Sequence, residues 1–249
     1  MQYNVLPLFK SHFSIGKSIL TLENEETTSE DNPDSIIAIA KENNLSEIFL
    51  AEDSMSGFLQ AASNCKLHKI KLNFGIRLTV CTNTHDKTTE SLSSNCKFLI
   101  FCKNYAGYKA LIKIYSFAAK EGFYYEPRID YVNLKKMWSD NLILGVPFYD
   151  SYIYNNLFYS EGIIPDIFTK AFYFQEDNDH PLDKHITKAV LKTGEEIIKS
   201  KSIYYKNKSD FPAYLSFRAI NERSSLAEPR LDHMCSDEFC FESWKKQNS

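Results

Sequence analysis

Residues 102–130 read CKNYAGYKALIKIYSFAAKEGFYYEPRID and carry the clearest structural pattern of the chain. The apolar run Lys97–Cys102 leads into this stretch and is typical of a buried strand. Apolar residues then recur at helical spacing through Gly107–Lys120, at Tyr108, Leu111, Ile112, Tyr115 and Ala119. A residue before proline stays extended, so Glu126-Pro127 marks a loop that enters a new element. The stretch therefore predicts a strand, a helix and a connecting loop.

The same alternation continues on both sides of this stretch. Strands are predicted over 4–9, 48–51, 72–80, 97–102, 141–146, 170–174 and 202–205. Helices are predicted from a start at 32–34 and over 56–65, 107–120, 182–199 and 211–221. Alternating strands and helices favour an α/β barrel or an open doubly wound sheet. No internal repeat and no linker interrupts the pattern, so residues 1–249 are predicted to form a single domain.

Composition restricts the classes of function. Hydrophobic residues make up 43% of the 249 residues and charged residues 24%, which is enough for a packed core. The net charge of −3 does not favour stand-alone DNA binding, because phosphate neutralisation needs an excess of cations. The six cysteines form no CxxC pair, the N-terminus has no export signal, and no apolar run could span a bilayer. A cytoplasmic protein with no membrane contact is predicted. Two basic stretches are predicted to be solvated surface: Lys66, Lys69, Lys71 and Lys199, Lys201, Lys206, Lys208.

The opening stretch resembles a signature of the PHP domain of bacterial-type (C-family) DNA polymerase III alpha subunits. The matching residues are Gly107, Tyr108, Leu111, Glu121, Gly122, Phe123, Tyr124, Pro127, Arg128 and Asp130. Weaker matches follow the family's motif order at Pro7–Ser14, Leu50–Phe58, Phe74–Val80 and Ser236–Trp244. The resemblance implies a distorted, TIM-like (β/α)7 barrel. It also implies, for active members, metal ions held by His, Asp, Glu and Cys side chains at the C-terminal ends of the strands.

This chain departs from the family at those metal-ligand positions. Aligning the motifs puts Leu8 and Lys10 where two histidines belong, Arg77 where a glutamate belongs and Phe148 where a cysteine belongs. Leucine and phenylalanine have no donor atom, and arginine stays protonated. We therefore expect a degenerate site without a metal ion or other cofactor. We also hypothesise that the charge of Lys10 replaces a lost ion by pairing with a remaining carboxylate.

The resemblance predicts the N-terminal PHP module of a replicative polymerase, present as a fragment or a separately encoded part and catalytically inactive alone. In this interpretation it is a scaffold that binds the polymerase core and a proofreading exonuclease, and it meets DNA only indirectly. The signature loop offers two readings. Arg128 and Asp130 form a bidentate pair that pins the loop, or the aromatic-rich loop holds a partner or nucleic acid.

Two alternatives stay open. The first is a metal-dependent phosphoesterase or 3′–5′ exonuclease with a rearranged site, which would use Zn, Mn or Mg. Its candidate residues are His12, Asp53, Asp177 and Asp210, with Glu52 as a substitute for Asp53 in the second motif. The second alternative is a stand-alone adaptor that regulates a polymerase.

Overall fold

The computed structural model describes residues 3–24, 32–158, 165, 167–176, 181–225 and 236–248. Contacts divide the chain into two compact units, Met1–Phe74 with Lys199–Ser249, and Gly75–Ile198. We call them unit 1 and unit 2. Two strands, β3 (Lys71–Cys81) and β8 (Glu196–Ile203), run through both units.

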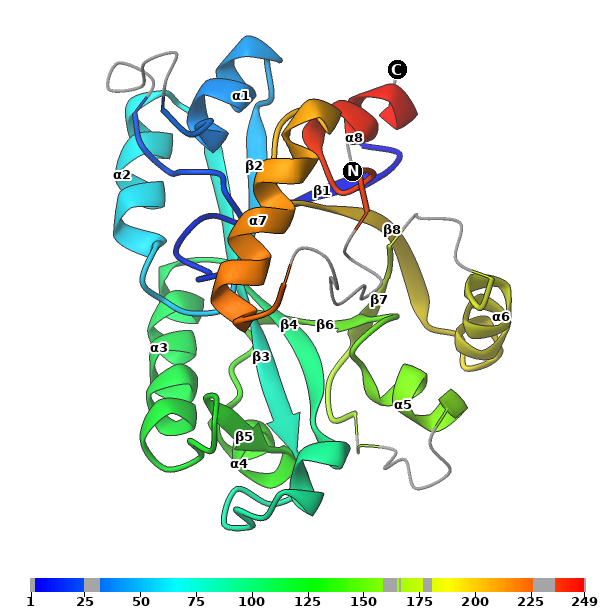
Figure 1. Cartoon of the computed structure of the whole chain (residues 1–249). Coiled ribbons are helices and arrows are strands. Elements are labelled where there is room, and N and C mark those ends of the chain that lie inside the picture. The colour runs from blue at the N-terminus through cyan, green and yellow to red at the C-terminus, as the bar shows by residue number, and fades with distance from the viewer. Residues whose placement is uncertain are drawn as a thin grey trace. The chain divides into compact units, whose positions relative to one another are not determined.

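Unit 1 holds the beginning and the end of the chain (Figure 1). Its elements are β1 (Leu6–Phe9), α1 (Ile36–Glu42), β2 (Glu47–Glu52), α2 (Phe58–Leu67), the 3-10 turn η3 (Lys208–Asp210), α7 (Phe211–Glu222) and α8 (Phe241–Asn248). Strand β1 pairs in parallel with β2 and with β8. The carboxyl ends of parallel strands meet at one edge, so the residues that follow β1 and β2 come together there.

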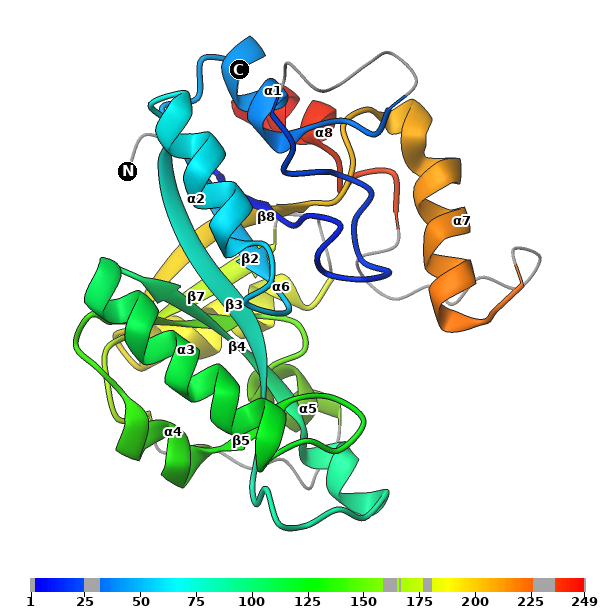
Figure 2. The same ribbon diagram turned by 90° about the vertical axis from the view of Figure 1, so that its left-hand side faces the viewer.

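Unit 2 holds the signature stretch. Its elements are the 3-10 turn η2 (Glu90–Ser94), β4 (Cys96–Cys102), α3 (Tyr105–Lys120), β5 (Arg128–Asp130), α4 (Tyr131–Met137), β6 (Leu142–Pro147), α5 (Tyr152–Phe158), β7 (Ala171–Glu176) and α6 (Asp183–Lys192). Strand β4 lies antiparallel between β3 and β6, whereas β6 and β7 are parallel. Helix α3 packs against β4 and β5 and lies beside α4 (Figure 2).

The strands hydrogen-bond in the order β2-β1-β8-β7-β6-β4-β3-β5, and β2 also pairs with β3. Following these pairings from β2 to β3 leads back to β2, which is the pattern of a closed barrel with β5 added beside β3. The predicted α/β barrel is therefore confirmed, and the open doubly wound sheet is excluded. Among the described residues, no helix has the length and hydrophobicity needed to cross a membrane.

Local chemistry explains where two predicted helices were wrong. The hydroxyl of Ser35 caps α1 by accepting from the backbone of Ile37 and Ala38, so this helix begins at Ile36 rather than near Asn32. The helix predicted over 182–199 ends at Lys192, because Gly194 follows with a φ of +77°. Its last residues belong to β8 instead. The sequence pattern also missed four elements: β5, α4, α5 and α8.

Candidate functional site

Lys10 places a cation directly after β1. Its residue is only 6% exposed, and its ammonium donates to the carboxylate of Asp53, which directly follows β2. The parallel pairing of Phe9 with Leu50 brings the ends of these strands together. The pairing hypothesised for Lys10 is therefore present, and Asp53 is the carboxylate that it meets.

Glu52 lies beside this pair and is fully buried. One carboxylate oxygen accepts from the backbone N–H of Ser11 at 3.0 Å, and the other accepts from the hydroxyl of Ser14. Burial raises the pKa of Glu52, and the two serines and the charge of Lys10 act in the opposite direction. The Ser14 hydroxyl also accepts from the backbone N–H of Asp53, at 2.8 Å. Glu52 thus fixes the loop after β1 to the end of β2.

Arg77 provides a second buried cation, in unit 2. Its residue on β3 is 8% exposed, and one guanidinium nitrogen lies 3.1 Å from a carboxylate oxygen of Asp150. Another lies 3.9 Å from a carboxylate oxygen of Glu176, whose side chain is 1% exposed. Glu176 ends β7 and Asp150 comes shortly after β6. Arg77 therefore compensates carboxylates at the ends of two strands.

Close contacts with the backbone explain why the signature stretch has glycine at two positions. A Cβ on Gly107 would lie 2.2 Å from the carbonyl oxygen of Asn141, and a Cβ on Gly122 would lie 1.8 Å from the carbonyl oxygen of Arg128. Both distances are far below any permitted contact, so only glycine fits. Asn104 caps α3 by accepting from the N–H of Gly107 at 3.1 Å.

Arg128 and Asp130 have separate partners, so the predicted bidentate pair is wrong. The buried guanidinium of Arg128 donates to the carbonyl oxygens of Gly122 at 3.3 Å and Asp86 at 3.0 Å. It also lies 5.1 Å from the ring centroid of Tyr124. Arginine suits a position that must donate to several carbonyl oxygens at once, because its five N–H groups point in fixed directions.

Asp130 caps α4 instead. Its carboxylate accepts from the backbone N–H of Asn133 and from the hydroxyl of Thr84, at 2.8 and 2.7 Å. Burial acts to raise the pKa of Asp130, but the hydrogen bonds from Asn133 and Thr84 outweigh it and lower the pKa. The pinning role expected for this loop is present, through other contacts.

The fold and these motifs agree with comparisons to known proteins. A model of the PHP domain family matches residues 26–204. The chain belongs to the PHP domain family. It is also 25% identical over 216 residues to the DNA polymerase III subunit alpha of Aquifex aeolicus, which covers 78% of this chain and 18% of that protein.

Two further relatives have the same description. The DNA polymerase III subunit alpha of Borreliella burgdorferi is 37% identical over 111 residues, 43% of this chain and 10% of that protein. The Chlamydia muridarum subunit is 32% identical over 126 residues, 50% of this chain and 10% of that protein. This PHP domain thus matches between 10% and 18% of the length of these relatives.

The side chains of this PHP domain at the aligned ligand positions do not fit a metal ion. Leu8 and Phe148 are buried and have no donor atom, while Lys10 and Arg77 are cations held by carboxylates. Over the described part of the chain, no group of three or more His, Cys, Asp and Glu side chains is placed to hold an ion. Divalent-metal chemistry needs such a cluster of O, N or S ligands.

The three described candidates for a rearranged enzyme site, His12, Asp53 and Asp210, form no group that could hold a metal ion. Asp210 accepts from the backbone N–H of Asn207 at 2.8 Å, as the N3 residue of the capping box of η3. Asp53 is paired with Lys10. The ring of His12 packs on Phe13 with centroids 4.4 Å apart, and its Nδ1 is buried without a hydrogen-bond partner among the described residues. Asp177 lies outside the described residues.

The remaining signature residues divide between packing and surface. Pro127 and Tyr108 are partly buried, and the ring of Tyr124 packs edge-on against Tyr125. Phe123 is 50% exposed and Tyr125 is 74% exposed, so the loop presents aromatic side chains to solvent. The reading of this loop as a binding surface therefore has a physical basis.

Sequence reasoning did not predict the ion pairs of three charged residues that lie in or near the strands. Asp150 and Glu176 pair with Arg77, but they lie far from it in sequence and match no motif. Lys201 on β8 is 1% exposed, with its ammonium 3.6 Å from Glu238. The position of Lys201 directly before the strand-like run Ser202–Tyr205 was the available signal, but the residue was assigned to solvated surface. For Lys201 that assignment is wrong.

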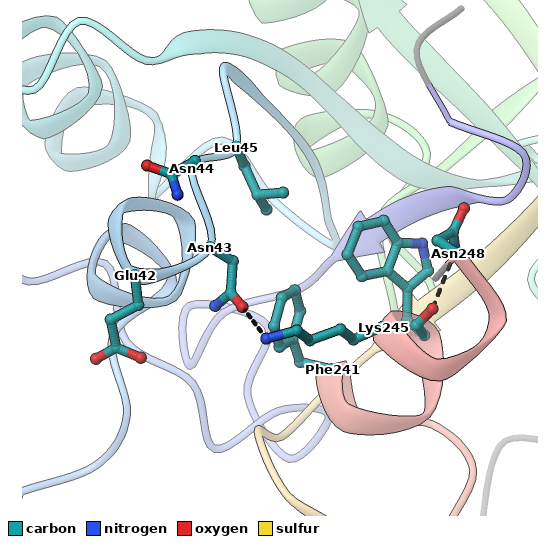
Figure 3. A pocket seen from close by; sticks show the side chains of 8 residues that line it. Glu42, Asn43, Asn44, Leu45, Phe241, Lys245 and Asn248 are labelled. Carbon is teal, nitrogen blue, oxygen red and sulfur yellow. Dashed lines mark hydrogen bonds between the residues drawn. The ribbon is translucent and has the colours of Figure 1, made fainter.

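A small pocket lies where the last helix meets α1 (Figure 3). It measures about 300 Å³ and is lined by Glu42, Asn43, Asn44, Leu45, Phe241, Trp244, Lys245 and Asn248. The ammonium of Lys245 donates to Asn43 at 2.7 Å, and the indole N–H of Trp244 donates to the carbonyl oxygen of Val5 at 2.8 Å. These contacts tie α8 to the start of unit 1, and the lining contains no histidine or cysteine.

Proposed function

We propose that this chain is a metal-free PHP module of a DNA polymerase III alpha-type protein and acts as a scaffold in DNA replication. In this proposal it has no phosphoesterase activity of its own and binds other parts of the polymerase. The observation that carries the proposal is the ion pair of Lys10 with Asp53, at a position where the family's motif has a histidine.

The charge balance supports a metal-free state. A metal ion in such a site offsets the repulsion and the desolvation of buried carboxylates. Lys10 supplies a positive charge beside Asp53 and Glu52, and Arg77 supplies one beside Glu176. Each carboxylate therefore has a cation without an ion being bound.

The signature loop supports a scaffold role. Arg128 donates to two backbone carbonyl oxygens, and the carboxylate of Asp130 accepts from Thr84 and Asn133. These hydrogen bonds fix the loop rigidly. A rigid frame that exposes Phe123 and Tyr125 suits partner binding, because little conformational entropy is lost on association. The relatives named above are polymerase subunits, so the partner we propose is a polymerase core, with a proofreading exonuclease as a further partner. DNA would be met through them.

The experiment that tests the scaffold role is affinity purification of the tagged full chain from the cells that encode it, followed by mass spectrometry. We expect enrichment of a DNA polymerase III alpha-type polypeptide over an untagged control. A tagged chain with Gly122→Ala, which breaks the loop, should lose this enrichment. Absence of any polymerase or exonuclease polypeptide from the wild-type sample would overturn the scaffold role.

A rearranged phosphoesterase site is not favoured by any contact described above, since Asp210 caps η3 and Asp53 holds Lys10. An adaptor acting on a polymerase encoded elsewhere would give the same enrichment. It is distinguished by the gene, because the module of a longer polymerase continues into the polymerase core beyond Ser249.

A further inference from the structure

Helix α3 and the turn before it carry an unusual charge for this chain. The segment Lys103–Lys120 contains four lysines (Lys103, Lys109, Lys113 and Lys120) and no aspartate or glutamate, although the whole chain has a net charge of −3. The first carboxylate after the segment is Glu121, which ends the helix. The segment is therefore a local concentration of positive charge on an acidic protein.

The lysines share one face of α3 with apolar side chains. Tyr105, Lys109, Ile112 and Lys120 follow each other at helical spacing, and all four are exposed. Tyr105 is 68% exposed, far more than packing against the barrel would leave. The residues that α3 buries, Gly107, Leu111, Ile114 and Ala118, follow a different side of the helix, and α3 packs against β4 and β5 (Figure 2).

Tyr105 is arranged as a platform for stacking. Its ring is stacked with that of Tyr108, with centroids 6.1 Å apart and an interplanar angle of 28°. The ammonium of Lys109 lies 4.8 Å from the centroid of the Tyr105 ring. The ammonium therefore lies over the face of the ring, and exposed aromatic rings close to cations are the groups that bind single strands, through base stacking and phosphate contacts.

Three lysines of unit 1 are neutralised by carboxylates. Lys71 pairs with Glu47, Lys206 with Asp34 and Glu42, and Lys208 with Asp237 and Glu238. On α3 the case differs. Over the described part of the chain, Lys109, Lys113 and Lys120 make no ion pair, and Lys103 donates only to the backbone carbonyl of Asp140 at 2.7 Å. Their charge stays available for an anionic partner.

We propose that the exposed face of α3, from Tyr105 to Lys120, binds single-stranded DNA. Lys109, Lys113 and Lys120 contact phosphates, and Tyr105 stacks on a base. This goes beyond the scaffold role, in which DNA is met only through other parts of the polymerase. It rests on the proposed function only for the choice of DNA as the polyanion.

The test is fluorescence anisotropy of a fluorescein-labelled oligothymidylate titrated with the full chain at several salt concentrations. The charge variant is Lys109→Glu with Lys113→Glu, and the stacking variants are Tyr105→Ala and Tyr105→Phe. The matched control is Lys184→Glu with Lys188→Glu on α6, where two exposed lysines have the same spacing and no tyrosine neighbour on that helix. It changes net charge by the same amount at another site.

We expect the wild type to bind at low salt. The charge variant should lower the slope of log K against log salt by about 1.4, because each phosphate contact on a single strand contributes about 0.7. Tyr105→Ala should weaken binding at least about 5-fold and Tyr105→Phe should restore it, since loss of one stacked base costs that much or more. The α6 control should stay within about 2-fold of the wild type.

No binding by the wild type at low salt would overturn the proposal and leave this face as a docking surface for protein. Equal losses in the α3 and α6 charge variants would also overturn it, since binding would then follow net charge alone. The α3 variants should still enrich the polymerase polypeptide in the purification described above. Failure of DNA binding and failure of the scaffold role are thus separate results.

Discussion

The ammonium of Lys10 donates to the carboxylate of Asp53, although the two residues lie after different strands, β1 and β2. Lys10 is nearly buried, while the Asp53 side chain is 38% exposed. A buried cation needs a partner far more than a half-exposed carboxylate does. The pair therefore fixes the loop after β1 chiefly because the buried ammonium of Lys10 needs a counter-charge.

The first prediction concerns this pair. Asp53→Ala should lower the free energy of unfolding by about 1–3 kcal/mol, because it leaves the buried ammonium of Lys10 without its main partner. Lys10→Met in the same background should recover part of the loss. Urea unfolding of the single and double variants measures the coupling. A coupling near zero would contradict the interpretation. Lys71→Met, which removes an exposed ion pair with Glu47, is the control and should cost less than about 1 kcal/mol.

The second prediction concerns Arg77. Arg77→Met should destabilise the protein by about 2–4 kcal/mol, since Glu176 is buried and loses the cation beside it. Adding Glu176→Gln should restore stability in part, because the neutral amide is cheaper to bury. Thermal unfolding of the wild type and the two variants is the measurement. If Glu176→Gln makes Arg77→Met worse, the charge argument for this position is wrong.

The third prediction separates steric contact from backbone conformation at two glycines. Gly122→Ala should cost about 3 kcal/mol or more, because the new Cβ would overlap the carbonyl oxygen of Arg128. Gly194→Ala meets no atom within 4 Å, but its φ is +77°, so only the left-handed conformation costs, about 1 kcal/mol. Equal losses at both positions would show that the close approach at Gly122 is not real.

The fourth prediction concerns pH. Burial raises the folded-state pKa of Glu52 above its unfolded value, so its contribution to stability is fully present below the unfolded pKa and is lost as pH rises through the folded pKa. Glu52→Gln keeps an oxygen that can accept from the backbone N–H of Ser11, and its amide NH2 can donate to the hydroxyl of Ser14. It should therefore remove this loss and flatten the stability profile above the unfolded pKa of glutamate. Urea midpoints across a pH series test this. A steeper fall for Glu52→Gln on the alkaline side would contradict it.

Much of the fold was predictable, and specific residues show why the rest was not. The strands around the signature stretch are apolar runs, and the helix after Gly107 has a clear period, so local pattern was enough there. The prediction of a helix beyond Lys192 was wrong because apolar residues of β8 also fit helical spacing. Gly194, which takes a positive φ and ends the helix, was not used as a stop signal. Strand β5 is too short to show a period.

The candidate site was predictable only where a motif existed. The match to Pro7–Ser14 placed Lys10 at a ligand position, and its pairing with a carboxylate followed from charge. The partners of Arg77 did not, because Asp150 and Glu176 reach it through strand order and not through spacing in sequence. The wrong pairing of Arg128 with Asp130 shows the opposite error, in which sequence proximity was taken for contact.

We propose that cations of the protein have replaced the metal ions of the family's site. Metal analysis of the purified full chain, expressed with added zinc and manganese and dialysed without a chelator, tests this replacement. We expect less than about 0.1 ion per chain and no hydrolysis of a phosphate ester. About one or more ions per chain, with a phosphoesterase activity that Asp53→Ala abolishes, would contradict the claim.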